Sequence, residues 1–225
     1  MIDFHSLNGT VDFIFTRHGE SESNKNGIMQ GRHPSRLTET GRAQARETGR
    51  ALSSRPPAVI LTSPLTRARE TALIIAEETG VPDLVTVDEL TETDLGIFTN
   101  ISGDQARVRF PAEWNAFLHG GWETVPGTEK CTDLASRARA VWARLIGLAA
   151  EGKQSILSVT HSGFLQWIIR VTMGLESWMP LIATSRHCGI TVLHVDNHTI
   201  PGSGRAYYVN WTMINLPSSL AFPAD

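Results

Sequence analysis

The sequence is poor in cysteine, has no long apolar run and carries no excess of positive charge. Its only cysteines, Cys131 and Cys188, are far apart and outside any C-x-x-C spacing. They offer neither a disulfide framework nor a zinc ligand set, so we expect a reducing, cytoplasmic location. No stretch approaches the ~20 apolar residues of a membrane span, and the N-terminal residues do not resemble a secretory signal. A formal net charge of −3 gives no general basic surface for nucleic acid.

Motifs for metals and nucleotides are also absent from the sequence. The histidines show no H-E-x-x-H pattern, and no G-x-x-x-x-G-K-[ST] loop occurs, so we expect neither a metal site nor a P-loop. No cofactor is implied either. What is present is an ordinary globular composition, with 41% hydrophobic and 19% charged residues. A chain of 225 residues can bury a substantial core.

Short apolar runs alternate with amphipathic segments along the chain. This alternation predicts a three-layer α/β/α fold with a mainly parallel central sheet of about six strands. A short turn joins the last two runs, so we expect a hairpin and one antiparallel edge strand. The expected strands are 11–16, 58–62, 84–87, 155–160, 189–195 and 206–214, and the expected helices are 38–54, 64–79, 104–118, 128–150 and 162–173.

Residues 96–127 form the one long irregular region. No repeat and no linker-like change of composition divides the chain, so we expect a single domain over residues 1–225. We interpret 96–127 as a lid-like insertion over one face that influences substrate specificity. Its bulky aromatic residues either line a substrate site or pack the lid onto the core; they are Phe98, Phe110, Trp114, Phe117 and Trp122.

Three of the expected strands hand over to helices through residues that can bind anions. The three stretches are RHG at 17–19, SPLTR at 63–67 and HSG at 161–163. In open α/β sheets ligands bind outside the carboxyl ends of the strands, where helix N-termini also attract anions. We therefore expect two histidines and two arginines to converge on one pocket. Guanidiniums that grip phosphate oxygens and an imidazole that can act as nucleophile suit a phosphoryl group.

Two of these stretches also predict how a helix starts. Ser63 is the expected N-cap and Pro64 the first helical residue, because proline lacks an N–H that a helix start does not need. Arg67 then lies in the first turn, where its charge opposes the helix dipole and a bound anion would resolve the conflict. Ser162 is a second candidate cap, directly after His161.

With these motifs in place, the sequence closely resembles the histidine phosphatase superfamily, which includes cofactor-dependent phosphoglycerate mutases and broad-specificity phosphatases. The resemblance spans most of the chain in the family's order and is highly specific as a set. It implies a phosphoglycerate mutase-like fold and a small phosphorylated metabolite as substrate, and it leaves open whether the chain forms a homodimer. The matching stretches are RHGESESN (17–24), MQG (29–31), LTETGRAQA (37–45), SPLTRARETA (63–72), LTETDLG (90–96) and VTHSGF (159–164).

The resemblance also implies roles for individual residues. His18 would be the nucleophile that becomes phosphohistidine. Arg17, Arg67 and His161 would surround the transferred phosphoryl group. Glu92 would donate a proton to the leaving oxygen and afterwards activate water. Weaker candidates for contact with the substrate are Asn24, Gln30, Gly31, Ser162 and Gly163.

Elementary chemistry agrees with the role of His18. An imidazole must be neutral to attack, and its ordinary pKa is about 6.5. The charges of Arg17 and Arg67 disfavour a second proton on the ring and so keep a lone pair free. Gly19 would allow a tight turn in which a backbone carbonyl holds the other ring nitrogen and sets the tautomer.

The chain departs from the family's pattern around the substrate mouth rather than in the phosphoryl pocket. The segment after MQG reads GRHPSRLT, and Gly96 is followed by IFTN. Before the long helix, Gly127-Thr128-Glu129-Lys130 stands where the family has Gly-Glu-Ser. These changes leave the substrate less defined than the chemistry.

Three functions stay open at this point. A phosphatase is favoured, because segment 96–127 is rich in aromatic residues and its FPAEWNAFLHG run resembles the broad-specificity branch. A mutase needs extra cations for a second phosphate, and the segment offers only Arg107, Arg109 and His119 against three acidic residues. The first alternative is a cofactor-dependent phosphoglycerate mutase. The second is a non-catalytic phospho-ligand-binding module, which predicts a broken pocket, whereas the pocket set is complete.

Overall fold

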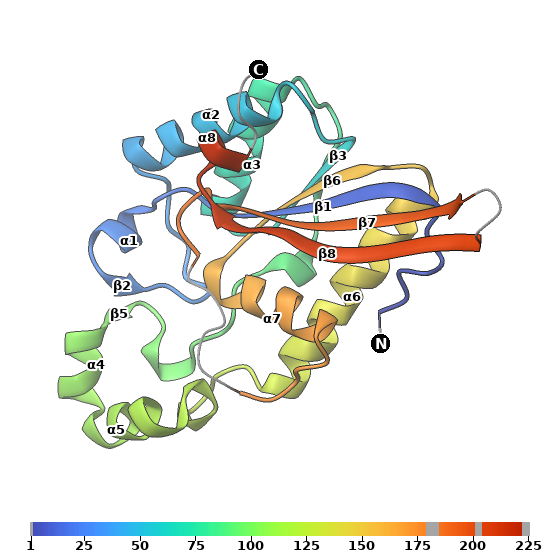
Figure 1. Ribbon diagram of the computed structural model, residues 1–225. Coiled ribbons are helices and arrows are strands. Elements are labelled where there is room, and N and C mark those ends of the chain that lie inside the picture. The colour runs from blue at the N-terminus through green and yellow to red at the C-terminus, as the bar shows by residue number, and fades with distance from the viewer. Residues whose placement is uncertain (1, 179–184, 201–203, 222–225) are drawn as a thin grey trace.

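The structure is a computed structural model that describes residues 2–178, 185–200 and 204–221 (Figure 1). Among these residues the central sheet has six strands in the order β4-β3-β6-β1-β7-β8. The strands are β1 (Gly9–Arg17), β3 (Val59–Thr62), β4 (Leu84–Thr86), β6 (Ser155–Thr160), β7 (Ile190–Ile200) and β8 (Gly204–Leu216).

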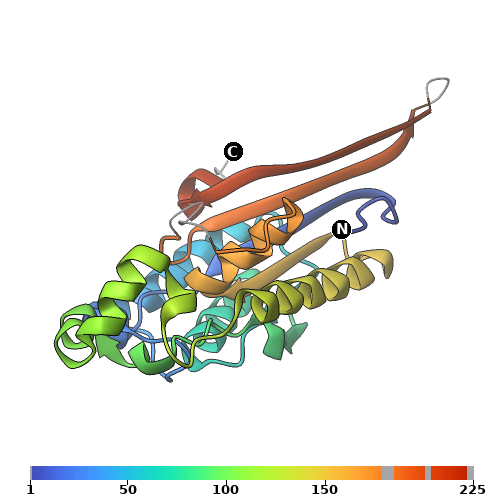
Figure 2. The same cartoon turned by 90° about the horizontal axis from the view of Figure 1, so that it is seen from below.

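The strand directions confirm the predicted, mainly parallel sheet. β1, β3, β4 and β6 run parallel, whereas β7 pairs in antiparallel fashion with both β1 and β8. Because β8 returns beside β7, the antiparallel strand lies one position in from the edge. Figure 2 shows the β7–β8 hairpin extending past the rest of the sheet.

Helices cover both faces of the sheet, which is why β3 and most of β1 and β6 are buried apolar runs. On one face lie α2 (Glu39–Leu52), α3 (Thr66–Thr79) and α8 (Ser218–Ala221); on the other lie α6 (Cys131–Ala150) and α7 (Ser162–Thr172) (Figure 1). Side chains alternate between the faces, so Phe13 and Phe15 pack with α6 and α7 while Ile14 packs with α2 and α3. Within the described ranges, no helix combines the length and the apolar character that crossing a membrane requires.

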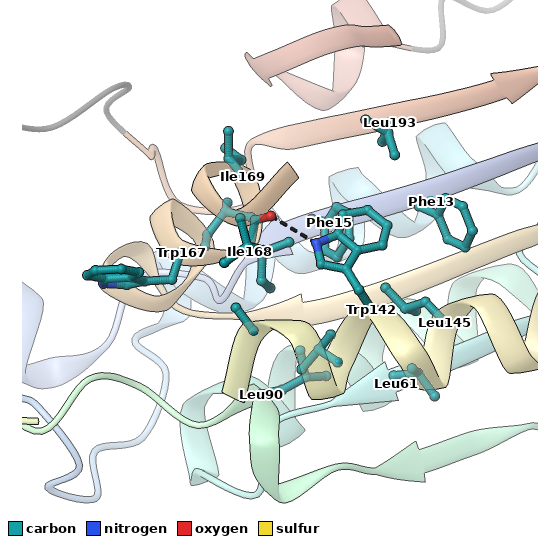
Figure 3. Packing of buried hydrophobic residues seen from close by; sticks show 14 of the residues in the cluster. Phe13, Phe15, Leu61, Leu90, Trp142, Leu145, Trp167, Ile168, Ile169 and Leu193 are labelled. Atoms are coloured by element: carbon teal, nitrogen blue, oxygen red, sulfur yellow. Dashed lines mark hydrogen bonds between the residues drawn. The ribbon is translucent and has the colours of Figure 1, made fainter. Parts of the chain in front are cut away.

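Trp142 ties α6, α7 and β1 together. Its ring meets Phe13 and Phe15 edge-on, with centroids 5.3 and 5.4 Å away. Its indole Nε1 donates to the carbonyl of Ile168 in α7 at 2.9 Å (Figure 3). The buried indole therefore keeps its polar atom satisfied while it fixes how α7 lies on the sheet.

Both predictions about helix caps are wrong. α3 begins at Thr66, after Leu65, and not at Pro64. The hydroxyl of Ser63 is fully buried, where it accepts from the backbone N–H of Leu65 at 3.2 Å and bonds Nε2 of His161 at 2.7 Å, so it serves the turn before α3 and a tertiary contact rather than a helix cap. Ser162 is the first residue of α7, and its N-cap is His161.

Segment 96–127 has more regular structure than its sequence suggests. It contains η2 (Gly96–Phe98), β5 (Ile101–Ser102), α4 (Gly103–Arg109), α5 (Pro111–Gly120) and η3 (Trp122–Thr124). The expected helix over 104–118 is broken at Phe110, because a residue before proline disfavours helical geometry. β5 pairs with β2 (Ile28–Met29), which joins the segment to the chain after β1.

The aromatic residues of this segment pack mainly on one another. The fully buried Phe98 is surrounded by four rings whose centroids lie 5.7–6.5 Å from its own. This cluster is separate from the two clusters on the main sheet. That the segment acts as a lid stays a prediction. The four rings are Phe110, Trp114, Phe117 and Trp122.

Candidate active site

The register of the parallel strands brings the three predicted stretches together. Arg17 pairs with Thr160, and Thr62 pairs with Val159, so the ends of β1, β6 and β3 are level. The residues that follow them therefore meet at one edge. The rings of His18 and His161 have centroids 5.1 Å apart.

His18 is held with one nitrogen pinned and the other presented to the site. Its Nδ1 lies 2.7 Å from the carbonyl oxygen of Gly19. Because a carbonyl can only accept, Nδ1 carries the proton and Nε2 keeps the lone pair. Burial and the charges of Arg67 and Arg17 lower the pKa of His18 well below its usual value. The ring is thus neutral, and the predicted carbonyl contact is confirmed.

The glycine at position 19 is required for a different reason from the one predicted. Gly19 does not have a positive φ. Instead its Cα presses against the backbone of Gly41 in α2, and a Cβ on either glycine would overlap the other segment's backbone. This close approach of the residues after β1 to α2 fixes the backbone of Gly19, whose carbonyl oxygen contacts Nδ1 of His18.

Arg67 is braced by the loop that follows β2. Its Nη2 donates to the carbonyl of Gly31 at 2.8 Å, its Nη1 to that of His33 at 2.9 Å, and its Nε to the lone pair on Nε2 of His18 at 3.2 Å, a bond that the phosphoryl group must replace before His18 can attack. A guanidinium has five N–H groups, so two remain for a ligand. Burial lowers the pKa of Arg67 to about 10, which still leaves a cation at neutral pH. Gly31 therefore positions Arg67 through its carbonyl.

Other buried polar atoms at this edge have unmet hydrogen-bonding capacity. Among the described residues, Arg17 Nε, His161 Nδ1 and Gln30 Oε1 have no partner. Arg17 is anchored through Nη1 on the carbonyl of Ser185 at 2.7 Å, and His161 through Nε2 on Ser63. Burial and the charge of Arg67 lower the pKa of His161 well below its usual value. An anionic ligand would satisfy the N–H of Arg17 Nε, and also Nδ1 of His161 in the tautomer that carries its proton there, whereas the amide oxygen of Gln30 needs a donor.

Glu92 lies across the start of α7. Its Oε1 accepts from the backbone N–H groups of Thr93 at 2.8 Å and Phe164 at 3.0 Å, and its Oε2 from that of Gly163 at 3.3 Å. A Cβ at Gly163 would come within 2.7 Å of Oε1, so the glycine makes this approach feasible. The Gly163 N–H, expected at the substrate rim, is thus directed at Glu92.

Residues 13–201 match the family description of the histidine phosphatase superfamily, branch 1. The chain belongs to this family. The match covers most of the sequence and confirms the resemblance on which the site was predicted.

Relatives of this histidine phosphatase carry names of both activities. A 2,3-bisphosphoglycerate-dependent phosphoglycerate mutase from Methylobacterium sp. (strain 4-46) is 32% identical over 169 residues, which are 73% of this chain and 81% of that protein. A glucosyl-3-phosphoglycerate phosphatase from Mycobacterium tuberculosis (strain CDC 1551 / Oshkosh) is 30% identical over 199 residues, 84% of this chain and 87% of that one. The solved structure of Mycobacterial hydrolase 1 has a TM-score of 0.77 at 24% identity, covers 92% of this chain and 99% of its own, and shows the same fold.

The site of this histidine phosphatase contains a third histidine that the sequence did not single out. The ring centroid of His187 lies 6.0 Å from that of His18, and its Nε2 is 3.1 Å from Oδ1 of Asn24. Burial and the charge of Arg17 lower the pKa of His187 to about 4. Asn24 thus contacts His187, and its Oδ1 also completes a capping box with Ser21 on the short helix α1 (Glu22–Lys25).

A second unpredicted feature is the ion-pair network that holds the loop of Glu92. Arg137, on α6, bonds both carboxylate oxygens of Glu129 at 2.9 and 2.8 Å. Arg32 donates to Glu129 at 2.8 Å and to the backbone carbonyl of Glu92 at 3.2 Å. The backbone N–H of Asp94 also points at Glu129, at 3.4 Å. The glutamate in the family-divergent stretch 127–130 therefore fixes the loop on which Glu92 sits.

Proposed function

We propose that this histidine phosphatase hydrolyses small phosphate monoesters through a phosphohistidine on His18, without a metal ion. The observation that carries the proposal is the state of His18, which is buried, neutral and pinned through Nδ1 so that Nε2 faces Arg67. A nucleophile in a fixed tautomer beside fixed cations is what phosphoryl transfer requires of a protein.

In the first step Nε2 of His18 attacks phosphorus and the bond from phosphorus to the ester oxygen breaks. Protonated Glu92 donates its proton to that oxygen, and the alcohol leaves. In the second step Glu92 takes a proton from water, whose oxygen attacks phosphorus. The bond from phosphorus to Nε2 breaks and inorganic phosphate is released, with His18 neutral again.

Arg17, Arg67 and His161 bind the phosphoryl oxygens in both steps. The transition state spreads charge over three equatorial oxygens, so fixed donors matter more than covalent help. By analogy with oxyanion donors, losing one of them costs roughly 3 kcal/mol, or about a hundredfold in rate. Ser162 lines the pocket beside Glu92, whereas Gln30 and Asn24 stay weaker candidates for contact with the substrate.

The positions of the cations in segment 96–127 favour hydrolysis over mutase activity, because these cations lie away from the pocket beside Glu92. Arg107 pairs with Asp104 on the exposed side of α4, and Arg109 lies over the ring of Phe110. His119 bonds the carbonyl of Asn115 within its own helix. None of these three lines the pocket beside Glu92 in the described part of the chain. A second phosphate in this pocket would meet one lining cation, Arg170, and none from segment 96–127.

Acid-quench labelling with a radioactive phosphate monoester tests the mechanism. We expect an acid-labile, base-stable adduct that His18→Ala abolishes, and turnover that survives EDTA. Equal labelling of His18→Ala would falsify the role of His18, and a reversible loss of activity in EDTA would disprove the metal-free mechanism.

Two further assays separate the alternatives. A coupled assay with 3-phosphoglycerate, with and without 2,3-bisphosphoglycerate, identifies a mutase by stimulation on adding the bisphosphate. Complete absence of p-nitrophenyl phosphate turnover between pH 4 and 8 would favour a non-catalytic binding module.

The proton-donor role of Glu92 has its own test. In Glu92→Gln, we expect the turnover of substrates with poor leaving groups to slow more than that of p-nitrophenyl phosphate. Equal slowing would contradict the proton-donor role of Glu92.

A further inference from the structure

A pocket of about 250 Å³ lies beside Glu92. We call it the tryptophan pocket, after Trp122, Trp167 and Trp178, which line it together with Leu95 and Leu134. Its walls come from the loop after Glu92, from η3, from the first turn of α6 and from α7. The proposed mechanism places the leaving oxygen at Glu92, so this pocket is where the alcohol half of a substrate would extend.

The pocket follows one face of α7. Gly163, Gln166, Trp167 and Arg170 all line it, and their spacing of three and four residues places them on the same side of a helix. At a rise of about 1.5 Å per residue, the distance from Gly163 to Arg170 is about 10 Å along the axis. A cavity of about 150 Å³ holds one benzene ring. The tryptophan pocket therefore has room for a substituted or a bicyclic ring.

Two of the three indoles, Trp167 and Trp178, are held in place independently of any ligand. Trp167 points away from the group of rings around Trp142 (Figure 3), and its side chain is nevertheless buried. Trp178 is seated against Gly121, where a Cβ would overlap its indole. Beyond them the guanidinium of Arg170 lies over the rings of Trp167 and Trp178, 5.1 and 5.7 Å from their centroids. Rigid aromatic walls favour a planar guest, because little conformational entropy is lost on binding.

The charges around the pocket give no net attraction for an anionic alcohol half. Glu92, Glu123 and Glu129 line it with one cation, Arg170. Glu129 is already paired with Arg32 and Arg137, and Glu92 carries a proton in the first step of the proposed mechanism, so Glu123 and Arg170 remain with opposite charges. A carboxylate on the leaving group would therefore lose its hydration without a net cationic partner, whereas a neutral ring needs none.

We propose that the tryptophan pocket binds the alcohol half of the substrate, and that this half carries a neutral aromatic or heteroaromatic ring. The proposal rests on the proposed function, since it assumes that Glu92 marks the leaving-group side. It predicts a preference for benzyl phosphate over methyl phosphate, whose alcohols are of similar acidity, so the comparison reports binding rather than leaving-group chemistry.

Steady-state kinetics with these two substrates are the first test. We expect kcat/KM for benzyl phosphate to exceed that for methyl phosphate by about a hundredfold, the effect of burying one aromatic ring. In Trp178→Leu the ratio should fall to about ten or less, and Trp122→Leu is a second variant in case the first does not fold. Trp114→Leu, which removes an indole from the aromatic cluster around Phe98 and not from the pocket, should keep the wild-type ratio.

Binding of phosphonates separates this proposal from the proposed function, because it needs no turnover. Benzylphosphonate should bind the wild type about a hundredfold more tightly than methylphosphonate, and Trp178→Leu should lose that difference. If the wild type binds benzylphosphonate and methylphosphonate equally, or binds neither, the proposal is overturned even when phospho-His18 is trapped. A preference for 3-phosphoglycerate or a sugar phosphate over benzyl phosphate also overturns it. Absence of the phospho-His18 adduct with intact phosphonate selectivity would instead overturn the mechanism alone.

Discussion

Replacing Arg137 by lysine should impair both stability and catalysis while leaving the phosphoryl pocket untouched. Arg137 Nη1 donates to the backbone carbonyls of Glu89 and Thr91 at 2.8 and 2.6 Å, and Nε and Nη2 grip the two oxygens of Glu129. Lysine keeps the charge but has one nitrogen in place of the planar fork. It therefore cannot bind Glu129 bidentately and hold the loop before Glu92 at the same time.

The magnitude follows from the bonds that lysine cannot make. Arg137→Lys loses at least two of these four hydrogen bonds, and a bond to a charged group is worth about 1.5–3 kcal/mol. The side chains of Arg137 and Glu129 are only 14% and 11% exposed, so water replaces little of the loss. The stacking of Arg137 on Phe164, at 3.8 Å, is lost as well. Because such losses are not additive, we expect the free energy of unfolding to fall by about 3 kcal/mol, which lowers the Tm by about 6–12 °C.

Catalysis should fall because Glu92 is no longer held in place. A displacement of about 1 Å can cost about a hundredfold in rate. We expect kcat for an alkyl phosphate to drop by about 10- to 100-fold and kcat for p-nitrophenyl phosphate, whose leaving group needs little protonation, to drop less. Thermal unfolding gives the Tm of each protein. The kcat values for both substrates are then measured at a temperature well below the variant's Tm.

Arg139→Lys is the matched control. Arg139 lies on the same helix, its side chain is 42% exposed and its partner Glu176 is 51% exposed, so the pair contributes little. Its Tm and both kcat values should stay at the wild-type level. An Arg137→Lys enzyme with wild-type Tm and an unchanged ratio of the two kcat values would refute the idea that this fork positions Glu92.

Three further predictions concern other parts of the site and a helix far from it. Gly19→Ala should abolish activity and lower the free energy of unfolding by at least about 1–3 kcal/mol, because its Cβ would overlap the backbone of α2. Gly147→Ala, in open space on α6, should instead raise the free energy of unfolding by about 0.5–1 kcal/mol. Equal Tm shifts of the two variants would contradict this. The pKa of His187 is about 4 in the folded state and about 6.5 in the unfolded one, so the unfolded chain binds the proton first and stability is lost as pH falls from 6.5 towards 4. Urea unfolding should therefore show a smaller loss between pH 7.5 and 5 for His187→Asn than for the wild type, and parallel pH profiles would speak against it. Ser63→Ala should lower kcat/KM about tenfold, because the 2.7 Å bond that orients His161 is removed and a buried nitrogen loses its partner; an unchanged kcat/KM would show that this bond is dispensable.

The core of the fold and the phosphoryl half of the site could be predicted because both follow from short-range rules. Alternating apolar and amphipathic segments predict a layered sheet, and the carboxyl ends of parallel strands must meet at one edge. Arg17, His18 and His161 are therefore neighbours by register alone. The carbonyl of Gly19 is the next atom group along the chain from His18, so its contact with the ring was also within reach.

The contacts that escaped prediction are tertiary. Ser63 fits the local rule for a cap in sequence, but the helix begins three residues later, and the fold places His161 beside the Ser63 hydroxyl, a contact that no local rule predicts. The crossing of Gly19 and Gly41 joins two segments that no pattern relates. His187 precedes β7, the strand that runs against the others, so its amino end arrives at the edge where the parallel strands finish. A histidine just before an antiparallel strand was a usable signal.

The two halves of the site differ in how they are built, and this explains why the sequence predicts the chemistry better than the substrate. The phosphoryl half stands on strand ends, whose geometry is set by the backbone hydrogen bonds of the sheet, so its residues must keep fixed positions in the chain. The tryptophan pocket is assembled from a loop, an insertion and one face of α7, which have no common register. Trp122, Trp167 and Trp178 each look like ordinary packing residues in the sequence. Only the fold shows that they face one cavity, and their side chains can change without disturbing the strand ends that carry the reaction.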